Sequence, residues 1–106
     1  MKKKWEEIKE ETLGKKFNLS VVFVGNKLMS KLNKTYRKKT GASNVLSFLL
    51  SKEEGEIFIN SKFGKKKYAD FLFAHSVLHL KGMSHGKKME TEEKKLMEKY
   101  KINNGA

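Results

Sequence analysis

All three histidines of this chain lie within eleven residues, in the stretch HSVLHLKGMSH, residues 75–85. His75 and His79 are four residues apart, so a helix over this stretch places both imidazoles on one face, one turn apart. Gly82 is suited to end that helix in a left-handed conformation, after which the chain can turn back. His85 follows three residues later, where it can bring a third ring nitrogen to the same point.

A convergent histidine cluster is either a metal site or a packed polar cluster. Two histidines at this spacing are usually surface or helix-end residues, but a third one beyond a helix-breaking glycine favours metal ligation. Three neutral imidazoles with an open fourth position are typical of catalytic zinc sites. Nickel, iron or copper would also fit, whereas magnesium would not. The chain has no cysteine, so a metal would have to be held by histidine, carboxylate or backbone oxygen. From the histidine pattern we expect one zinc or similar ion per chain, held by His75, His79 and His85.

The apolar pattern predicts alternating helices and strands. Helical spacing predicts helices over 2–13, from a cap at Asn26 to about 39–41, over 65–82 and over a closing stretch that includes 89–100. Apolar, β-branched runs predict strands over 17–25, 44–50 and 56–60, the last two paired as a hairpin. This order predicts an α+β fold, a small mixed β-sheet packed with helices, with the metal site on a central helix. The length suits one domain, residues 1–106.

The balance of charge points to a polyanionic partner. The chain has 24 basic and 12 acidic residues, a formal net charge of +12, which attracts polyanions over long range. We expect nucleic acid as the first candidate and an anionic membrane surface as the second, although lysine can also serve simply as a solvated surface. No stretch is apolar enough to span a bilayer, and no signal peptide is evident. The lack of cysteine fits a cytoplasmic location.

The only arginine, Arg37, stands in YRKKTGASNVLSF, residues 36–48, between an expected helix and an expected strand. Its guanidinium can hold a phosphate through two parallel hydrogen bonds, whereas a lysine acts as a point charge. A single arginine among 23 lysines therefore indicates a phosphate contact, with an ordinary surface residue as the alternative. Asn44 and Ser47 either face a groove or simply begin the strand. The residues of this stretch expected to contact substrate are Arg37, Lys38, Lys39, Asn44 and Ser47.

Three segments carry a resemblance to a known family. LNKTYRKKTGASNVLSF (32–48) is similar to a Leu-Asn-x-x-Tyr-Arg stretch followed by Thr-Asn-Val-Leu-Ser-Phe. GEIFIN (55–60) is similar to a Gly-Asp-Ile strand, and HSVLHLKGMSHG (75–86) to a His-Gly-x-Leu-His-Leu-x-Gly-Tyr-Asp-His signature. In this order the segments resemble the YbeY family of bacterial ribosomal RNA maturation factors, which are metal-dependent, single-strand-specific endoribonucleases.

The resemblance implies that His75, His79 and His85 are zinc ligands and that Arg37 takes part in RNA cleavage. It also implies a role in 3′-end maturation of 16S ribosomal RNA and in ribosome quality control, with ribosomal proteins as partners and no action on DNA. The chain departs from the family pattern at several positions. These departures are Ser76 for glycine, Met83 and Ser84 for Tyr-Asp, Ala42 and Ser43 for Pro-Thr, and Glu56 for aspartate.

Three functional classes are compatible with the sequence. The first, which we expect, is an endoribonuclease in which the metal polarises a phosphodiester oxygen or delivers hydroxide, and Arg37 stabilises charge on the phosphate. The second is a non-catalytic RNA- or ribosome-binding assembly factor whose structural metal is closed by Glu56 or Glu90. The third, a metalloprotease, is disfavoured because Ser76 stands where the HExxH motif has its general-base glutamate. The oligomeric state stays open.

Overall fold

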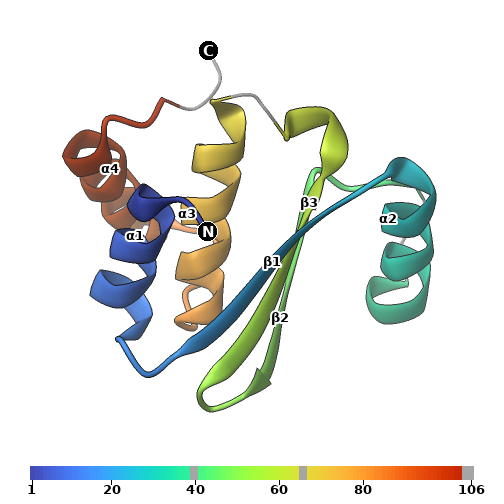
Figure 1. Ribbon diagram of the computed structural model, residues 1–106, viewed down its shortest axis with the longest axis horizontal. Helices are drawn as coiled ribbons and strands as arrows, with labels where there is room; N and C mark the ends of the chain where they lie inside the picture. Colours follow the sequence, from blue (N-terminus) through green and yellow to red (C-terminus); the bar gives the residue numbers. More distant parts are fainter. Residues whose placement is uncertain (39–40, 65–66, 104–106) are drawn as a thin grey trace.

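The computed structural model describes residues 1–38, 41–64 and 67–103. Within these described residues, four helices and three strands follow one another in the predicted order, together with two short helical turns (Figure 1). Their bounds are α1 (Lys3–Leu13), β1 (Asn18–Val24), α2 (Asn26–Leu32), η1 (Asn33–Arg37), β2 (Val45–Ser51), β3 (Glu54–Asn60), η2 (Ser61–Phe63), α3 (Tyr68–Leu80) and α4 (Lys87–Tyr100). The fold is therefore α+β, as the sequence predicted.

The three strands form one mixed sheet in the order β1-β3-β2. β2 and β3 pair antiparallel, which confirms the predicted hairpin, and β1 pairs parallel to β3. Ile57 of β3 thus has Val21 of β1 on one side and Ser47 of β2 on the other. β2 is an edge strand of this sheet, and α3 packs against it.

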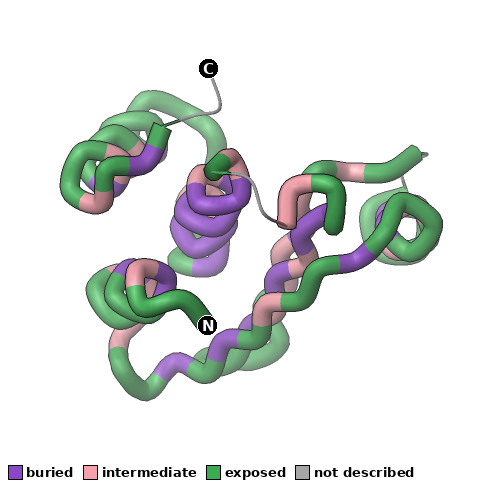
Figure 2. Tube along the Cα trace, turned by 45° about the horizontal axis from the view of Figure 1, so that its top comes forward, coloured by how far each residue is buried: buried purple, intermediate pink, exposed green. Residues whose placement is uncertain are grey.

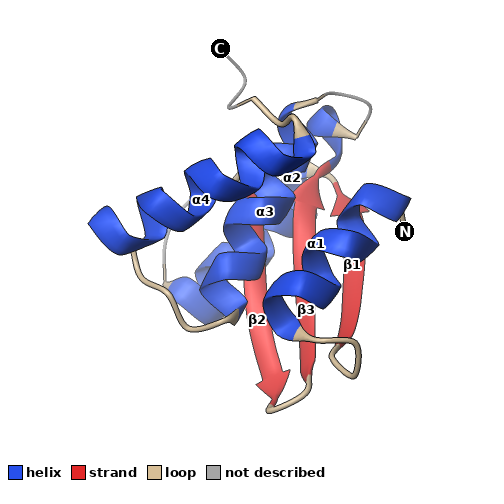
Figure 3. Ribbon diagram, turned by 90° about the vertical axis from the view of Figure 1, so that its left-hand side faces the viewer, coloured by secondary structure: helices blue, strands red, loops and turns tan. Residues whose placement is uncertain are grey.

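The helices form two unequal layers around the sheet. α1, α3 and α4 lie on one face and α2 lies on the other (Figures 1 and 3). α3 is the central helix, because nine of its 13 residues are buried between the sheet and its neighbours (Figure 2). Apolar residues from the sheet and from all three helices on this face form the main core. None of the helices in the described residues is long and apolar enough to cross a membrane.

α2 covers a smaller apolar cluster on the opposite face, built around Met29 and Leu46. The sequence predicted Asn26 as the cap of this helix, which is wrong, because Gly25 is the N-cap and no side chain caps it. Instead, Oδ1 of Asn26 accepts a hydrogen bond of 2.6 Å from Nδ2 of the buried Asn60. A buried amide needs a partner, so the asparagine side chain joins the start of α2 to the end of β3 rather than capping the helix.

α3 ends as the sequence predicted. Its backbone closes in a Schellman motif, with the Gly82 N–H donating to the His79 carbonyl at 2.9 Å and the Met83 N–H donating to the Leu78 carbonyl at 3.1 Å. Gly82 has a φ of +105°, a conformation that side-chain-bearing residues rarely adopt. The described helix, Tyr68–Leu80, is shorter than the predicted span 65–82, of which residues 65–66 lie outside the described part of the chain.

A buried hydrogen bond joins α1 to α3. Nε1 of Trp5 donates to Oδ1 of Asp70 at 2.7 Å, and the indole stacks on Phe73 with ring centroids 4.5 Å apart. The ammonium groups of Lys2 and Lys4 each lie 3.5 Å from the same carboxylate. This contact fixes the N-terminal half of the helix that carries the histidines.

Replacing Asp70 tests this contact. Asp70→Ala leaves the buried indole N–H without an acceptor, so we expect a loss of about 1–3 kcal/mol in the free energy of unfolding, measured by urea denaturation. Asp70→Asn keeps an acceptor oxygen and should lose less. Equal stability of the alanine variant and the parent would contradict this role for the hydrogen bond.

Candidate metal centre

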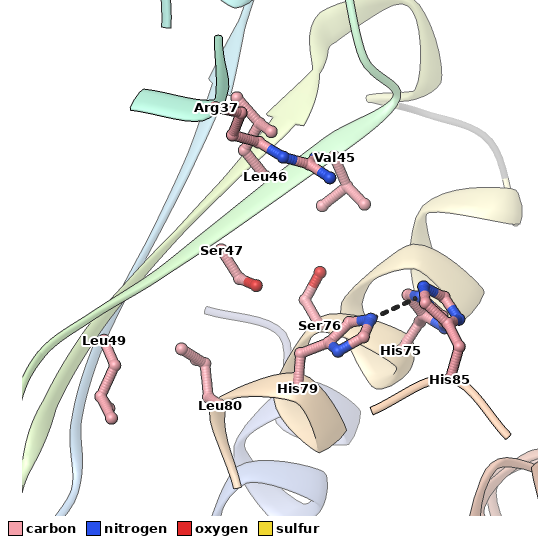
Figure 4. A pocket seen from close by; sticks show the side chains of 10 residues that line it. All are labelled: Arg37, Val45, Leu46, Ser47, Leu49, His75, Ser76, His79, Leu80 and His85. Atoms are coloured by element: carbon pink, nitrogen blue, oxygen red, sulfur yellow. Dashed lines mark hydrogen bonds between the residues drawn. The ribbon is translucent and has the colours of Figure 1, made fainter. Parts of the chain in front are cut away.

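The three histidines converge at the C-terminal end of α3. His75 and His79 project from the same face of the helix, and the turn after Gly82 returns His85 to them (Figure 4). Each can offer one ring nitrogen, and these nitrogens all lie within 4.8 Å of one another. His75 and His79 are half-buried and His85 is exposed, so one side of the cluster is open to solvent. The group can therefore hold a metal ion.

The outer nitrogens of two rings have acceptor partners. Nδ1 of His79 lies 3.0 Å from the carbonyl oxygen of Met83, and Nδ1 of His75 contacts Oε2 of Glu93 on α4. A carbonyl and an ionised carboxylate only accept hydrogen bonds, so Nδ1 must carry the proton in both rings. In a neutral imidazole this leaves Nε2 as a lone-pair nitrogen, which is the form that binds metals.

The inner nitrogens of these two rings face each other. Nε2 of His79 lies 3.0 Å from Nε2 of His75 (Figure 4). Two lone pairs at this separation repel unless a cation lies between them. Nitrogens bound to one tetrahedral zinc ion at 2.0–2.1 Å would lie roughly 3.3 Å apart. The donor set and its spacing therefore fit a transition metal.

The environment of His79 favours its neutral form. Burial lowers the pKa of His79 below its usual range, and the neighbouring His75 and His85 lower it further, while the hydrogen bond to the Met83 carbonyl opposes them. An imidazole with a lowered pKa keeps its lone pair at neutral pH. The ring is thus ready for a metal without first losing a proton.

The histidines form part of the wall of a cleft of about 500 Å³ between β2 and α3 (Figure 4). Side chains alternate between the two faces of a strand, so Ser47 and Leu49 of β2 point into the cleft, where they face Leu80 of α3. Arg37 reaches the same cleft from the end of η1. One cleft therefore holds a potential metal site, a cation and a partly apolar wall.

The segment that carries Arg37 is fixed by Asn33 at the start of η1. Nδ2 of this buried asparagine donates to the carbonyl oxygen of Gly41 at 2.9 Å and to Oγ of Ser43 at 2.6 Å. These bonds tie η1 to the chain that enters β2. The sequence predicted a continuous α-helix to about 39–41, whereas the backbone widens into a π-helical turn and leaves it at Lys38, which has a φ of +53°.

The other residues predicted to contact substrate are placed differently. Ser47 is half-buried and lines the cleft. Lys38 and Asn44 are exposed and do not belong to the described residues that line it. The carbonyl oxygen of Asn44 accepts a hydrogen bond of 2.8 Å from the Asn60 N–H. Lys39 lies outside the described residues.

Sequence reasoning missed one acidic residue at the site. Glu56 and Glu90 were candidates for a fourth ligand, but within the described chain neither belongs to the group that could hold an ion together. The carboxylate that contacts the cluster is that of Glu93, on the far side of the His75 ring. Helical spacing could have identified this residue. Glu93 lies four residues after Met89 and three before Leu96, the two buried residues of α4, so it belongs to the face of the helix that packs on the core.

A family model and two relatives of known name all match this chain to the same family. The family model for endoribonuclease YbeY matches residues 1–103. A protein named endoribonuclease YbeY from Thermodesulfovibrio yellowstonii is 34% identical over 106 residues, which cover 78% of this chain and 67% of that protein. A protein of the same name from Clostridium botulinum strain Loch Maree is 30% identical over 126 residues, which cover 85% of this chain and 74% of that protein.

A solved structure has the same fold. The solution structure of a Thermotoga maritima protein superimposes with a TM-score of 0.53 and 25% sequence identity, covering 92% of this chain and 76% of that one. The family model spans nearly all of the chain, and the relatives reach 30% identity or more over at least two thirds of their own length. The chain therefore belongs to the YbeY endoribonuclease family.

Proposed function

We propose that this protein is a zinc-dependent endoribonuclease that cleaves single-stranded RNA. Membership of an endoribonuclease family supports the reaction class. The observation that carries the proposal is the cleft in which three convergent imidazoles and the single arginine line the same space. Neutral imidazole ligands leave the full charge of a divalent ion available to a phosphodiester, which is a better partner for it than a neutral peptide.

Each side chain of the cleft has a distinct task in this reaction. His75, His79 and His85 would hold the ion, which when bound supplies Lewis-acid chemistry to a phosphate group. The guanidinium of Arg37 donates hydrogen bonds to non-bridging phosphate oxygens and stabilises the negative charge that develops on them. Ser47 lines the same cleft, and its hydroxyl would hydrogen-bond the same nucleotide.

The form of the cleft supports a single-stranded substrate. Leu49 and Leu80 give it an apolar end, on which an unpaired base or ribose can rest while the phosphate meets the polar end. Bases in a duplex are stacked and paired, so they cannot turn into such a cleft, whereas loops and chain ends can. The net charge of +12 adds a sequence-independent attraction for the RNA backbone.

We further propose that the substrate is ribosomal RNA in the cytoplasm. The proposal includes 3′-end maturation of the 16S molecule and ribosome quality control, together with contacts to ribosomal proteins. Its support is the resemblance of three sequence segments to the family of ribosomal RNA maturation factors, and the basic charge, which suits a ribosomal surface.

A non-catalytic assembly factor with a structural metal is the alternative. A structural zinc site is normally closed by four protein ligands. Within the described residues the histidine group contains no carboxylate, and Glu93 contacts the outer side of a ring. A three-ligand site with an exposed side suits catalysis better, so this alternative is less well supported.

Metal binding by the histidines can be measured directly. We expect about one equivalent of zinc per chain, and His79→Ala should abolish tight binding in a competition with a chromogenic chelator. Affinity should fall from about pH 7.5 to about pH 5.5, because protons compete for the imidazole lone pairs. Because its pKa is lowered, the His79 ring should resist protonation to a lower pH than an ordinary histidine does. Sub-stoichiometric zinc, or binding that His79→Ala leaves intact, would contradict the site.

The role of Arg37 can be separated from metal binding. Arg37→Ala should reduce the turnover of a fluorescent single-stranded RNA by the zinc-loaded protein about 100- to 1,000-fold. The reason is that the negative charge developing on the phosphate loses the guanidinium that stabilises it. Arg37→Lys should restore only part of the rate. Lys34→Ala, which removes a neighbouring exposed cation of η1, is the matched control and should change turnover little. Full turnover and RNA affinity in Arg37→Ala would remove this role.

A further inference from the structure

We propose that Glu93 is a positioning residue of the metal centre, which holds the His75 ring so that its Nε2 faces the ion. Glu93 lies on α4, 18 residues after His75, and its Oε2 contacts Nδ1 of that ring. The inference rests on the metal binding proposed above and is independent of RNA cleavage. It assigns a task to a residue that belongs neither to the histidine group that could hold an ion nor to the described residues that line the cleft.

The contact is shielded from solvent. The side chain of Glu93 is 14% exposed and that of His75 is 21% exposed. The adjacent Glu92 provides the contrast, because it pairs with Lys95 at 3.5 Å and the two side chains are 40% and 69% exposed. An exposed pair is screened by water and contributes little, whereas a shielded carboxylate on a ring N–H holds its partner in place.

Packing fixes the backbone from which Glu93 projects. Met89 and Leu96 are buried in the main core, one turn before and one turn after Glu93 on the same face of α4. The apolar anchors hold this face against α3, so the carboxylate meets the imidazole without a further loss of backbone freedom. A partner held by rigid elements is the arrangement that keeps a site in its productive geometry.

The ring of His75 is constrained from two directions. Phe71 stacks on it with ring centroids 5.9 Å apart and planes inclined by 29°, which limits its tilt. Glu93 limits rotation about the remaining axis, because turning the ring over would break the contact at Nδ1. The two restraints leave one orientation, in which Nε2 lies 3.0 Å from Nε2 of His79.

The direction of the contact excludes two other tasks for Glu93. The nitrogens of an imidazole point away from each other, so a carboxylate on Nδ1 does not also reach an ion on Nε2. For the same reason it does not contact a substrate in the cleft, whose described lining does not include it. The chemistry is that of a carboxylate–histidine–metal triad, in which the carboxylate sets the tautomer and raises the basicity of the ligand.

The test compares three variants for zinc affinity by chelator competition. Glu93→Ala should bind zinc about 10- to 100-fold more weakly than the parent. Glu93→Gln keeps an acceptor oxygen without the charge, so its affinity should lie between those of the parent and Glu93→Ala. Glu92→Gln, the matched control on the same helix, should bind as the parent does. Thermal unfolding of the metal-free proteins checks that α4 remains folded.

A spectroscopic measurement on the parent keeps the proposal testable even if Glu93→Ala does not fold. Long-range ¹H–¹⁵N spectra of the zinc-loaded protein should show His75 protonated at Nδ1 with zinc on Nε2, and Glu93→Gln should shift the Nδ1 proton. The reverse tautomer would overturn the proposal, as would a folded Glu93→Ala with parental zinc affinity or a Glu93→Gln no better than Glu93→Ala. A parent that binds no zinc would instead overturn the proposed function.

Discussion

The site depends on one constraint, the close approach of two imidazole lone pairs on neighbouring turns of one helix. The 3.0 Å between Nε2 of His75 and Nε2 of His79 is unfavourable for two acceptors and favourable once a cation joins them. Each ring is held there by an acceptor on its outer nitrogen, the Met83 carbonyl for one and the Glu93 carboxylate for the other. The proposed metal site is thus oriented by contacts that lie outside the group of potential ligands.

The fold supplies these contacts from separate elements. The Schellman motif at the end of α3 turns the Met83 carbonyl toward His79 and brings His85 round to the cluster. The apolar face of α4 packs on the core, which places the Glu93 carboxylate against the His75 ring. β2 forms the opposite wall of the cleft, and η1 leads Arg37 to it. Because nine of the 13 residues of α3 are buried, His75 and His79 stand on a tightly packed backbone.

The parts of the structure that the sequence predicted well are those set by local rules. Helix periodicity places His75 and His79 together, and a glycine at the C-terminal stop needs only its own backbone freedom. Likewise, the hairpin of β2 and β3 follows from two apolar runs across a charged turn. These features involve residues that are close in the chain, so the pattern carries enough information to assign them.

The parts that the sequence did not reveal depend on packing between distant elements. Asparagine is a common helix cap, but the side chain of Asn26 instead accepts a hydrogen bond from the buried amide of Asn60, 34 residues later. Glu93 resembles the other acidic residues of α4 until the packing of that helix on α3 shows which one meets a histidine. The π-helical turn that carries Arg37 is fixed by hydrogen bonds from Asn33 to the chain beyond it. Tertiary contacts, and not local preference, decide each of these cases.

X-ray absorption at the zinc edge of the loaded protein tests most directly whether the three histidines hold the ion. The zinc should be surrounded by three imidazole nitrogens at about 2.0–2.1 Å, with no carboxylate of the protein among its ligands. Fewer than three imidazoles in that shell, or four protein ligands closing it, would contradict a site built on His75, His79 and His85 with one position open.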